Sequence, residues 1–381
     1  METLLNYPIS GKCISQEKKT YIAWKLQVTY FNFLTILNWI NMQKIKIHLL
    51  ILVALTFLFT SCEKLFFSPE PASDPISNFQ YLWDKVDQQY AFFDVKNADW
   101  DDMYLKYAPK IHTGLSDDSL FFFLASMMNE LKDGHVNLFS DFNISRFDIT
   151  KLGPNNIDYR FIQDNYLGLD YYSTGPFRHD FIANNDIAYV RYSSFSSNFS
   201  DSNLLYIFNR YQDTQGLILD MRQNGGGYIN NVFKLLSHFT LSENPLYTTC
   251  IKAGPDHENF TENEAVYSTP YDSLLNYTKP IAVLIDRGSY SATSMFSLAT
   301  LSLDNVFLVG DTTGGGLGMP NGGQLPNGWT YRFSITRTLT PDGINYENGI
   351  PPDYYVVLDS SDMQQGYDTV IETALDVLLG R

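Results

Sequence analysis

The sequence predicts an α/β fold in which a core of parallel strands follows a small helical subdomain and a β-rich connecting segment. The core is indicated by the strand-like runs "GLILDM", "IAVLI" and "NVFLVG", which alternate with the helix-like runs "INNVFKLLSHF" and "SATSMFSLATLSL"; this order is typical of parallel sheets. Apolar residues at helical spacing between residues 75 and 131 indicate the helical subdomain. Short β-rich runs separated by Gly, Pro, Asn and Asp indicate the connecting segment.

Individual elements carry their own signals. Ser116, followed by two aspartates, predicts the start of the third helix of the subdomain. In the connecting segment, we expect strands at "NIDYRFI", "LGLDYY" and "IAYVRYSSF". The stretch "QLPNGWTYRFSITRT" at 324–338 has an Asn-Gly turn between two runs and predicts a hairpin. The chain contains no repeat of fixed period.

A secretory signal precedes these elements. Two lysines stand before a run at 49–59 that is apolar except for Thr56, and two small residues come directly before Cys62. The run is short for a membrane span, which favours a cleaved signal over the alternative, an internal membrane anchor with a cytoplasmic tail. The stretch resembles a bacterial lipobox of the Bacteroidetes type, which implies cleavage before Cys62 and lipidation of its thiol. A signal belongs at an N-terminus, so we expect Met42 to be the true start.

These signals divide the chain into six expected parts. From the N-terminus onward they are 1–41, an upstream extension; 42–61, a signal peptide; 62–74, a tether; 75–135, the helical subdomain; 136–195, the β-rich segment; and 196–381, the α/β core.

Composition narrows the classes of function. Lys and Arg number 26 against 42 Asp and Glu, which gives a formal net charge of −16. Such a charge repels phosphate backbones, so nucleic-acid binding is excluded. The three cysteines, Cys13, Cys62 and Cys250, are too few and too scattered for a disulfide framework or a cysteine-based zinc site. We expect neither a metal nor a cofactor.

Two loops follow strands at the edge where ligands bind in parallel α/β sheets, "DMRQNGGGY" and "DRGSYS". Glycines in the first loop can turn their N–H groups toward an anion, although a glycine triplet is more often only a tight turn. Ser291 opens the helix after the second loop, where the helix N-terminus would stabilise an alkoxide. An N-capping serine is the commoner role there, and Ser289 and Ser294 share that alternative. His135 lies in a Gly-containing turn suited to projecting an imidazole into a cleft.

Five motifs in order carry a family resemblance: "LKDGHVNLF", "LILDMRQNGGG", "VLIDRGSYSATSMF", "LVGDTTGGG" and "TPDGINYENGIPPD". Over roughly residues 75 to 378 the chain resembles the C-terminal-processing (tail-specific) serine peptidase family, which includes the tricorn core. The resemblance implies a crotonase/ClpP-like spiral core with an N-terminal helical subdomain. The stretch 136–186 is short for the peptide-binding PDZ domain of some relatives, so no PDZ domain is expected.

The resemblance also implies roles for individual residues. Ser291 would be the nucleophile. One branch of the family uses a lysine at the position of Gly315, so the match is to the tricorn-like branch, with His135 as base and Glu347 as its support. Ser294 stands where many relatives have a glutamate, and Gly134 stands where the tricorn branch sometimes has a hydroxyl donor. The oxyanion hole would be formed by Gly226 and Ala292, and the substrate site by Gly225, Gly227, Gly314 and Gly315.

We therefore expect a serine endopeptidase that cleaves extended or unfolded polypeptides and is held at the cell envelope by a lipid anchor. The rival hypothesis is an inactive binding protein on the same scaffold, since 27 Phe and 26 Tyr could line a pocket for an apolar ligand or a peptide. A purely structural lipoprotein would leave Ser291, His135 and Glu347 far apart.

Overall fold

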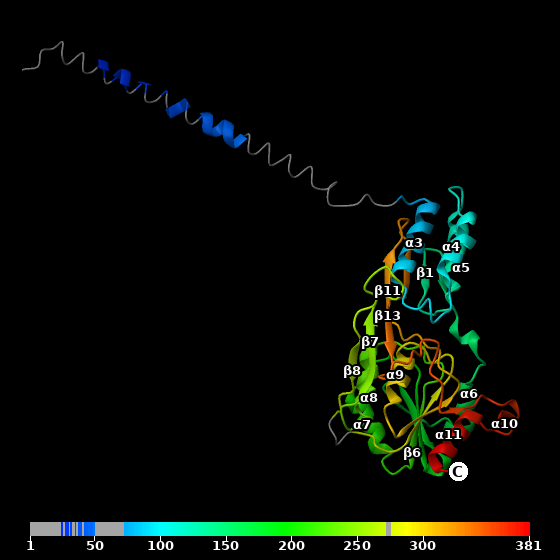
Figure 1. The fold of residues 1–381 in the computed structure, drawn as a ribbon. Coiled ribbons are helices and arrows are strands. Elements are labelled where there is room, and N and C mark those ends of the chain that lie inside the picture. Colours follow the sequence, from blue (N-terminus) through cyan, green and yellow to red (C-terminus); the bar gives the residue numbers. More distant parts are fainter. Residues whose placement is uncertain are drawn as a thin grey trace, which may run out of the picture. The chain divides into compact units, whose positions relative to one another are not determined.

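The computed structural model describes residues 72–271 and 276–381, together with parts of the stretch 24–49 (Figure 1). Two compact units divide the chain, Met1–Glu70 and Pro71–Arg381. The described residues of the first unit are helical. Cys62, the expected cleavage site and most of the expected tether lie outside the described residues. Among the helices that are described, none is both long and apolar enough to cross a bilayer.

Three helices open the second unit, α3 (Pro75–Gln89), α4 (Trp100–Tyr107) and α5 (Asp117–Asn129). Each begins at a residue whose side chain accepts a backbone N–H, as strong N-caps do. Ser116 is the cap of α5, because its Oγ accepts the Ser119 amide at 3.3 Å. The predicted helix start is therefore confirmed.

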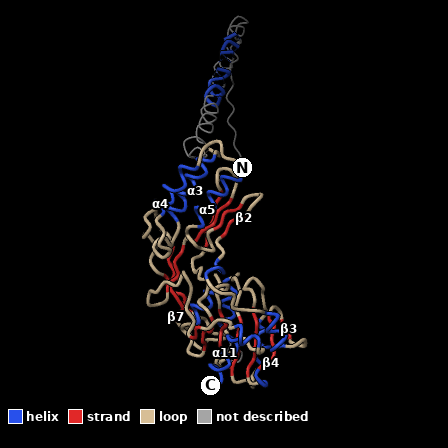
Figure 2. The backbone as a smooth tube through the Cα atoms, turned by 90° about the vertical axis from the view of Figure 1, so that its right-hand side faces the viewer, coloured by secondary structure: helices blue, strands red, loops and turns tan. Residues whose placement is uncertain are grey.

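The helices cover one face of a four-stranded antiparallel sheet, whose order is β11-β12-β1-β2. Its strands are β1 (Asn137–Phe139), β2 (Ile144–Arg146), β11 (Pro320–Gln324) and β12 (Thr330–Ser334). Leu138, Tyr331 and Phe333 point from the sheet into a core that they share with the helices. Figure 2 shows α3, α4 and α5 beside β2 at one end of this unit, with β3, β4 and α11 toward the other end.

The central sheet has seven strands in the order β14-β10-β9-β6-β5-β4-β3. Strands β14, β10, β9, β6 and β5 are parallel, whereas β4 and β3 continue the sheet antiparallel. Their bounds are β3 Tyr172–Thr174, β4 Phe177–Ile182, β5 Ile187–Tyr192, β6 Gly216–Asp220, β9 Ile281–Ile285, β10 Val306–Gly310 and β14 Tyr354–Tyr355. The parallel part confirms the predicted α/β core.

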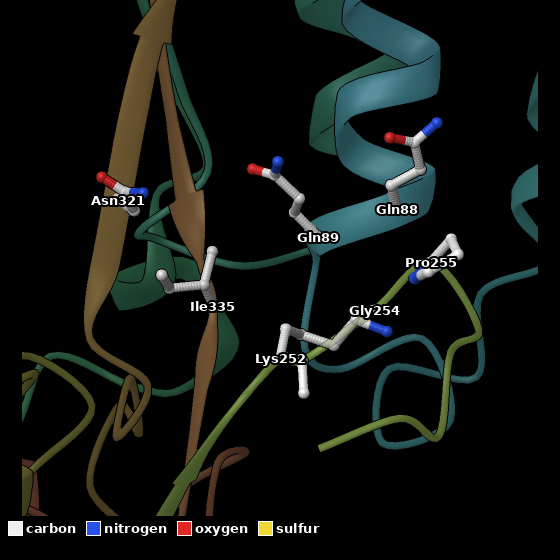
Figure 3. Close-up of a pocket in the computed structure, with 8 residues that line it drawn as sticks. Gln88, Gln89, Lys252, Gly254, Pro255, Asn321 and Ile335 are labelled. Atoms are coloured by element: carbon white, nitrogen blue, oxygen red, sulfur yellow. The ribbon is translucent and has the colours of Figure 1, made fainter. Parts of the chain in front are cut away.

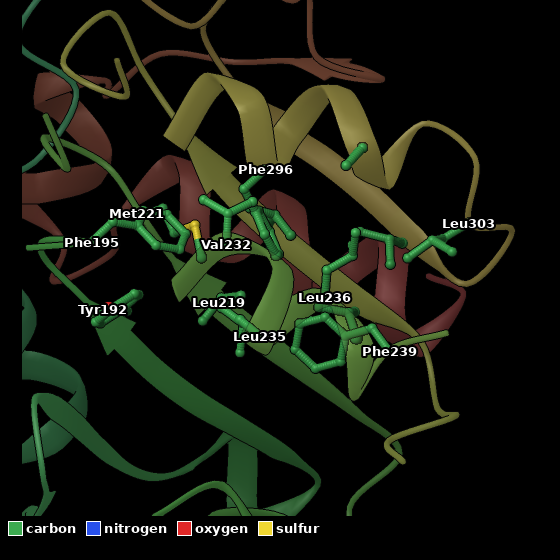
Figure 4. Close-up of a cluster of buried hydrophobic side chains, with 14 of the residues drawn as sticks. Tyr192, Phe195, Leu219, Met221, Val232, Leu235, Leu236, Phe239, Phe296 and Leu303 are labelled. Atoms are coloured by element: carbon green, nitrogen blue, oxygen red, sulfur yellow. The ribbon is translucent and has the colours of Figure 1, made fainter. Parts of the chain in front are cut away.

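Helices lie on both faces of this sheet, as a fully buried parallel sheet requires. One face packs against α7 (Asp201–Arg210), α8 (Ile229–Ser237) and α9 (Ala292–Thr300), and Figure 4 shows apolar side chains of β6, α8 and α9 meeting there. The other face packs against α6 (Tyr159–Ile162) and α11 (Thr369–Leu379). A short helix, α10 (Ser360–Gln364), precedes α11. A third sheet, β13-β7-β8, contains Thr336–Leu339, Pro245–Ile251 and Glu264–Tyr267.

The predicted hairpin is confirmed, since β11 and β12 pair antiparallel from Pro320↔Ser334 to Gln324↔Thr330. The expected strand "NIDYRFI" is wrong: it contains helix α6, because the Asp158 side chain accepts the Phe161 amide at 3.0 Å and starts a helical turn. Residues 136–195 are shared between two sheets. Strands β1 and β2 join the four-stranded sheet and β3 to β5 the seven-stranded one, because their pairing partners are distant in sequence.

Candidate active site

Ser291 stands between β9 and α9, at the carboxyl end of a central parallel strand. Its backbone has φ 57° and ψ −118°, a conformation that is strained for a residue with a Cβ. Its hydroxyl makes no capping bond to the helix that it precedes. The N-cap interpretation therefore fails for Ser291, whose Oγ is left available at the helix N-terminus.

The two neighbouring serines have structural partners instead. Ser289 Oγ donates to the Met221 carbonyl at 2.9 Å and accepts the Asp286 amide at 3.1 Å. Ser294 Oγ lies 3.1 Å from the Ser289 carbonyl and 3.1 Å from Thr313 Oγ1. Both serines are fully buried and tie the turn around Ser291 to adjacent loops.

His135 precedes β1 and meets Ser291 across the two sheets. Its Nε2 lies 3.0 Å from Ser291 Oγ, which is hydrogen-bonding distance. The preceding residue has no room for a side chain, because a Cβ at Gly134 would come within 2.9 Å of the Tyr290 ring. Tyr290 in turn packs against the imidazole, with 4.9 Å between ring centroids. Gly134 therefore lets the imidazole lie between the nucleophile and Tyr290.

Burial and local charges set the protonation of His135. The residue is 6% exposed, and burial lowers the pKa of its imidazole below the usual value, with Asp133 opposing that shift. The imidazole is therefore neutral at neutral pH and free to accept a proton. Its Nδ1 lies 3.5 Å from Ser334 Oγ on β12, and the Gly318 backbone also hydrogen-bonds the ring.

Glu347 is buried behind this pair, but it does not hydrogen-bond the imidazole. Its Oε2 accepts the amides of Leu317 at 2.7 Å and Gly318 at 3.1 Å. The other oxygen lies 3.9 Å from Lys96 Nζ. Burial, followed by repulsion from Asp133, raises the pKa of Glu347 to about 8. We expected Glu347 to support His135 directly. In this structure Glu347 instead binds the backbone at 317–318, and it reaches the imidazole only through that backbone.

The glycine loop after β6 passes directly over the nucleophile. A Cβ at Gly226 would lie 2.8 Å from the Ala292 nitrogen and 2.9 Å from the Ser291 Cβ, and the Gly226 φ is +93°. The Gly226 amide donates to Asn224 Oδ1 at 3.0 Å in this conformation. Within the described residues, no acceptor takes the Ala292 amide. Of the two amides expected to bind the oxyanion, that of Ala292 is thus free, whereas that of Gly226 is hydrogen-bonded within its own loop.

Gly314 and Gly315 lie behind the nucleophile rather than in the cavity wall. The Gly315 carbonyl accepts the Ser291 amide at 2.9 Å, and the Gly314 amide donates to the Ser289 carbonyl at 2.8 Å. A Cβ at Gly315 would come within 1.9 Å of the Glu347 carbonyl oxygen. The expected substrate-binding role of these two glycines is therefore corrected to support of the turn that carries Ser291.

A cavity of about 840 Å³ opens over Ser291 and His135. Its wall includes the expected Gly225, Gly226, Gly227 and Ala292, and many of its other residues are apolar or aromatic: Phe139, Ile144, Tyr228, Ile229, Tyr290, Met295, Leu317, Met319 and Pro320. A second cavity, of about 550 Å³, shares no wall residue with the first (Figure 3). Its wall holds no serine, histidine or carboxylate, so it offers no nucleophile and base.

Several residues around the site were not singled out in the sequence. Asp133 accepts hydrogen bonds from the His135 amide, the Tyr90 hydroxyl and the Tyr290 hydroxyl at 2.7, 2.9 and 3.2 Å. Asn224 fixes the glycine loop by donating to the Tyr192 carbonyl at 2.9 Å. Asp133 could have been noticed, because it lies in the same motif as His135. Ser334 carries no local signal, since only strand pairing brings it to the imidazole.

Comparison with known proteins places this geometry in a family. The sequence model of "Peptidase family S41" matches residues 186–356, and that of the "Tricorn protease C1 domain" matches residues 71–129. A crystal structure of a candidate peptidase from Parabacteroides merdae is 40% identical with a TM-score of 0.77, covering 81% of this chain and 97% of that one. The chain belongs to peptidase family S41. It is thus a homologue of serine-type peptidases, as the five motifs suggested.

Two further similar proteins are more distant. "Carboxy-terminal processing protease CtpB" of Bacillus subtilis is 25% identical over 175 residues, which are 45% of this chain and 34% of that protein. The crystal structure of the tricorn protease has a TM-score of 0.53 at 16% identity, over 81% of this chain and 36% of that one, and this likeness concerns the fold. The chain spans about a third to less than half of the length of the curated relatives that it matches.

Proposed function

We propose that this S41 family member is a serine endopeptidase that cleaves extended or unfolded polypeptides through an acyl-enzyme. The observation that carries the proposal is the 3.0 Å separation of His135 Nε2 and Ser291 Oγ at the wall of the cavity. A nucleophile within hydrogen-bonding distance of a neutral base is the arrangement that acyl transfer requires. It also favours a peptidase over an inactive binding protein, for which this contact has no use.

In the proposed mechanism, Ser291 Oγ attacks the scissile carbonyl while His135 Nε2 takes the hydroxyl proton. The imidazolium then gives that proton to the leaving amine, and a water molecule repeats the sequence on the acyl-enzyme. The Nδ1 proton would be donated to the Ser334 hydroxyl, while the Gly318 backbone also hydrogen-bonds the ring, and this tautomer leaves Nε2 free to accept. Glu347 acts as a positioning residue, because it holds the amides of Leu317 and Gly318.

The developing oxyanion would be stabilised by main-chain amides. The Ala292 amide lies at the start of α9, where the helix dipole favours negative charge. The second donor would come from the glycine loop over Ser291, either from Gly226 once it leaves Asn224 Oδ1 or from a neighbouring amide. An apolar cavity suits the side chains of an extended segment better than those of a folded protein, whose apolar residues are hidden.

Covalent labelling tests the proposal. A fluorophosphonate probe should attach to wild-type protein at Ser291, as mapped by mass spectrometry of the modified peptide. Since burial lowers the pKa of His135, the labelling rate should fall as the imidazole takes a proton in acid, and the midpoint of that fall should lie below 6.5, the ordinary pKa of a histidine. Absence of labelling in folded protein would refute the peptidase.

The same labelling assay tests whether Glu347 acts as an uncharged hydrogen-bond acceptor or as a charged carboxylate. Its pKa of about 8 means that the neutral carboxyl predominates at pH 7. Glu347→Gln keeps an oxygen for the two backbone amides and should therefore label at close to the wild-type rate. Glu347→Ala leaves both amides unpaired and should label about tenfold more slowly. A Glu347→Gln protein that is as slow as Glu347→Ala would show that a charged carboxylate is needed.

We also propose that the protein is tethered to the cell envelope through a lipid on Cys62. The proposal rests on the apolar run at 49–59 and the small residues before the cysteine. Metabolic labelling with a radioactive fatty acid, in cells that express the full chain, should mark the processed protein that begins at Cys62, and Cys62→Ser should abolish the label. An unlabelled wild-type protein, expressed in a bacterium with lipoprotein processing, would rule out the anchor.

A further inference from the structure

Two arginines and an asparagine form a row across three strands of the four-stranded sheet. The register pairs Asn137 on β1 with Arg332 on β12 and with Arg146 on β2. Directly opposed residues of adjacent strands lie on one face of the sheet, with Cβ atoms about 4.5–5.5 Å apart. The row therefore places one guanidinium group on each side of the Asn137 side-chain amide.

The row faces the catalytic cavity. Asn137 is the first residue of β1, and both it and His135, in the turn just before the strand, line this cavity. Leu138, between Asn137 and Phe139, points to the opposite face, into the core with the helices. Asn137, Arg146 and Arg332 are all part of the cavity wall that contains Ser291.

Among the residues that the structure describes, these two arginines carry the only full charges in the wall of this cavity. No aspartate or glutamate lines it, although the chain has 42 acidic residues against 26 basic ones. Within the described part of the chain, neither arginine forms an ion pair. The acid nearest to Arg146 in sequence, Asp148, is turned to the Thr150 amide and hydroxyl at 3.2 and 2.7 Å. Positive charge is thus concentrated where the protein as a whole is negative.

The Arg332 guanidinium is held in place but is not saturated. Its Nε and Nη2 donate to Asn137 Oδ1 at 2.9 and 2.5 Å, while Nη1 has no partner among the described residues. Both arginine side chains are exposed. A guanidinium presents paired N–H groups in a planar fork that matches a carboxylate. An anion that binds here would meet one fixed guanidinium and one adjustable guanidinium.

We propose that Arg332 and Arg146 form a carboxylate-binding subsite that selects polypeptides bearing a carboxylate a few residues from the cleaved bond. The inference rests on the proposed peptidase function, and it assigns the substrate class. The carboxylate is that of an aspartate or glutamate side chain. Successive residues of an extended chain advance about 3.3 Å each, so a residue a few positions from the cleaved bond lies beside another part of the cavity wall that holds Ser291 and the row.

Binding measurements test this subsite independently of catalysis. The full chain carrying Ser291→Ala is titrated into fluorescein-labelled octapeptides of alanine and valine, and fluorescence anisotropy gives Kd. One series scans a single glutamate through each position with an amidated C-terminus, and its twin carries glutamine. A second pair has no acidic side chain, differs only in a free or amidated C-terminus, and measures binding through the C-terminus separately. At least one glutamate peptide should bind about tenfold or more tightly than its glutamine twin, as a charge-assisted hydrogen bond predicts.

Arginine variants identify the groups responsible. Arg332→Gln and Arg146→Gln should each reduce the preference for the carboxylate, and the double variant should remove it. Arg160→Gln is the matched control, because its side chain is 91% exposed and lies outside the cavity wall. It changes net charge equally and should leave the preference intact. Thermal melting checks that each variant is folded; if Arg332→Gln is not, Arg146→Gln alone should still reduce the preference.

The outcomes separate this inference from the proposed function. Equal binding of carboxylate and amide twins, no binding of any peptide, or an equal loss in Arg160→Gln would overturn the subsite. Wild-type protein assayed in parallel with the fluorophosphonate probe reports on the peptidase by itself. A labelled Ser291 without any carboxylate preference would leave the peptidase standing and remove the subsite. A carboxylate preference without labelling of Ser291 would support the subsite and refute the peptidase.

Discussion

Replacing Ser291 by alanine should lower kcat for an unfolded protein substrate by about four orders of magnitude or more, as in other serine peptidases that lose their nucleophile. The hydroxyl makes no structural bond to helix α9, so its removal should not destabilise the fold. Release of peptides from reduced, alkylated casein measures turnover. Thermal unfolding followed by circular dichroism measures stability, and the melting temperature should stay close to that of the wild type.

Ser294→Ala is the matched control for this prediction. Ser294 lies on the same helix and its hydroxyl contacts the Ser289 carbonyl and Thr313 Oγ1. Losing these buried hydrogen bonds should cost about 1 kcal/mol of stability and leave most of the turnover. A folded Ser294→Ala protein that is inactive, or an active Ser291→Ala protein, would contradict the assignment of the nucleophile.

Replacing Gly315 by alanine should destabilise the protein by about 2–4 kcal/mol, since it adds a steric clash to a strained backbone. The φ of Gly315 is +79°, and its Cβ would stand 1.9 Å from the Glu347 carbonyl oxygen. The main chain at 347 would have to move, and the Ser291 amide, which donates to the Gly315 carbonyl, would move with it. Urea denaturation gives the free energy of unfolding, and casein cleavage reports the displaced nucleophile.

Gly343→Ala shows how much of the loss of stability comes from backbone strain and how much from the steric clash. Gly343 also has a positive φ, +90°, but an added Cβ meets nothing within 4 Å. It should therefore cost only the strain, about 1 kcal/mol. Equal losses at both glycines would show that packing against Glu347 is unimportant. The space beside Gly315 is filled by main chain, so a lysine placed there would require the same movement of the backbone as the alanine.

Much of the fold could be predicted because its signals are local. The alternating runs that became β6, α8, β9, α9 and β10 have the periodicity of buried strands and amphipathic helices. Ser116 has the sequence context of a helix cap and is one. The prediction of a strand at "NIDYRFI" was wrong because a cap at Asp158 outweighed the β-rich composition. The division of 136–195 between two sheets depends on partners such as Gly216 and Arg332, which local patterns do not reveal.

The candidate site could be predicted only as far as the family motifs reached. They named Ser291 and His135, and the structure brings these two side chains together. They did not show that Glu347 would meet the backbone at 317–318, because hydrogen bonds to main-chain amides leave no mark in side-chain identity. Asn137, Arg146 and Arg332 were also missed. Their row exists only in the register of three strands, two of which are joined by a pairing across 195 residues of sequence.

The division of the site between two sheets has a consequence for synthesis of the chain. His135 leaves the ribosome early, but β1, which follows it, pairs with β12 at 330–334. Ser291 has already been translated by then, but β1 is so far paired only with β2, its neighbour in sequence. A growing polypeptide should therefore be unable to cut itself or its neighbours until the β1–β12 ladder closes. Proteolytic competence would then arrive only after residues 330–334 have been made and paired.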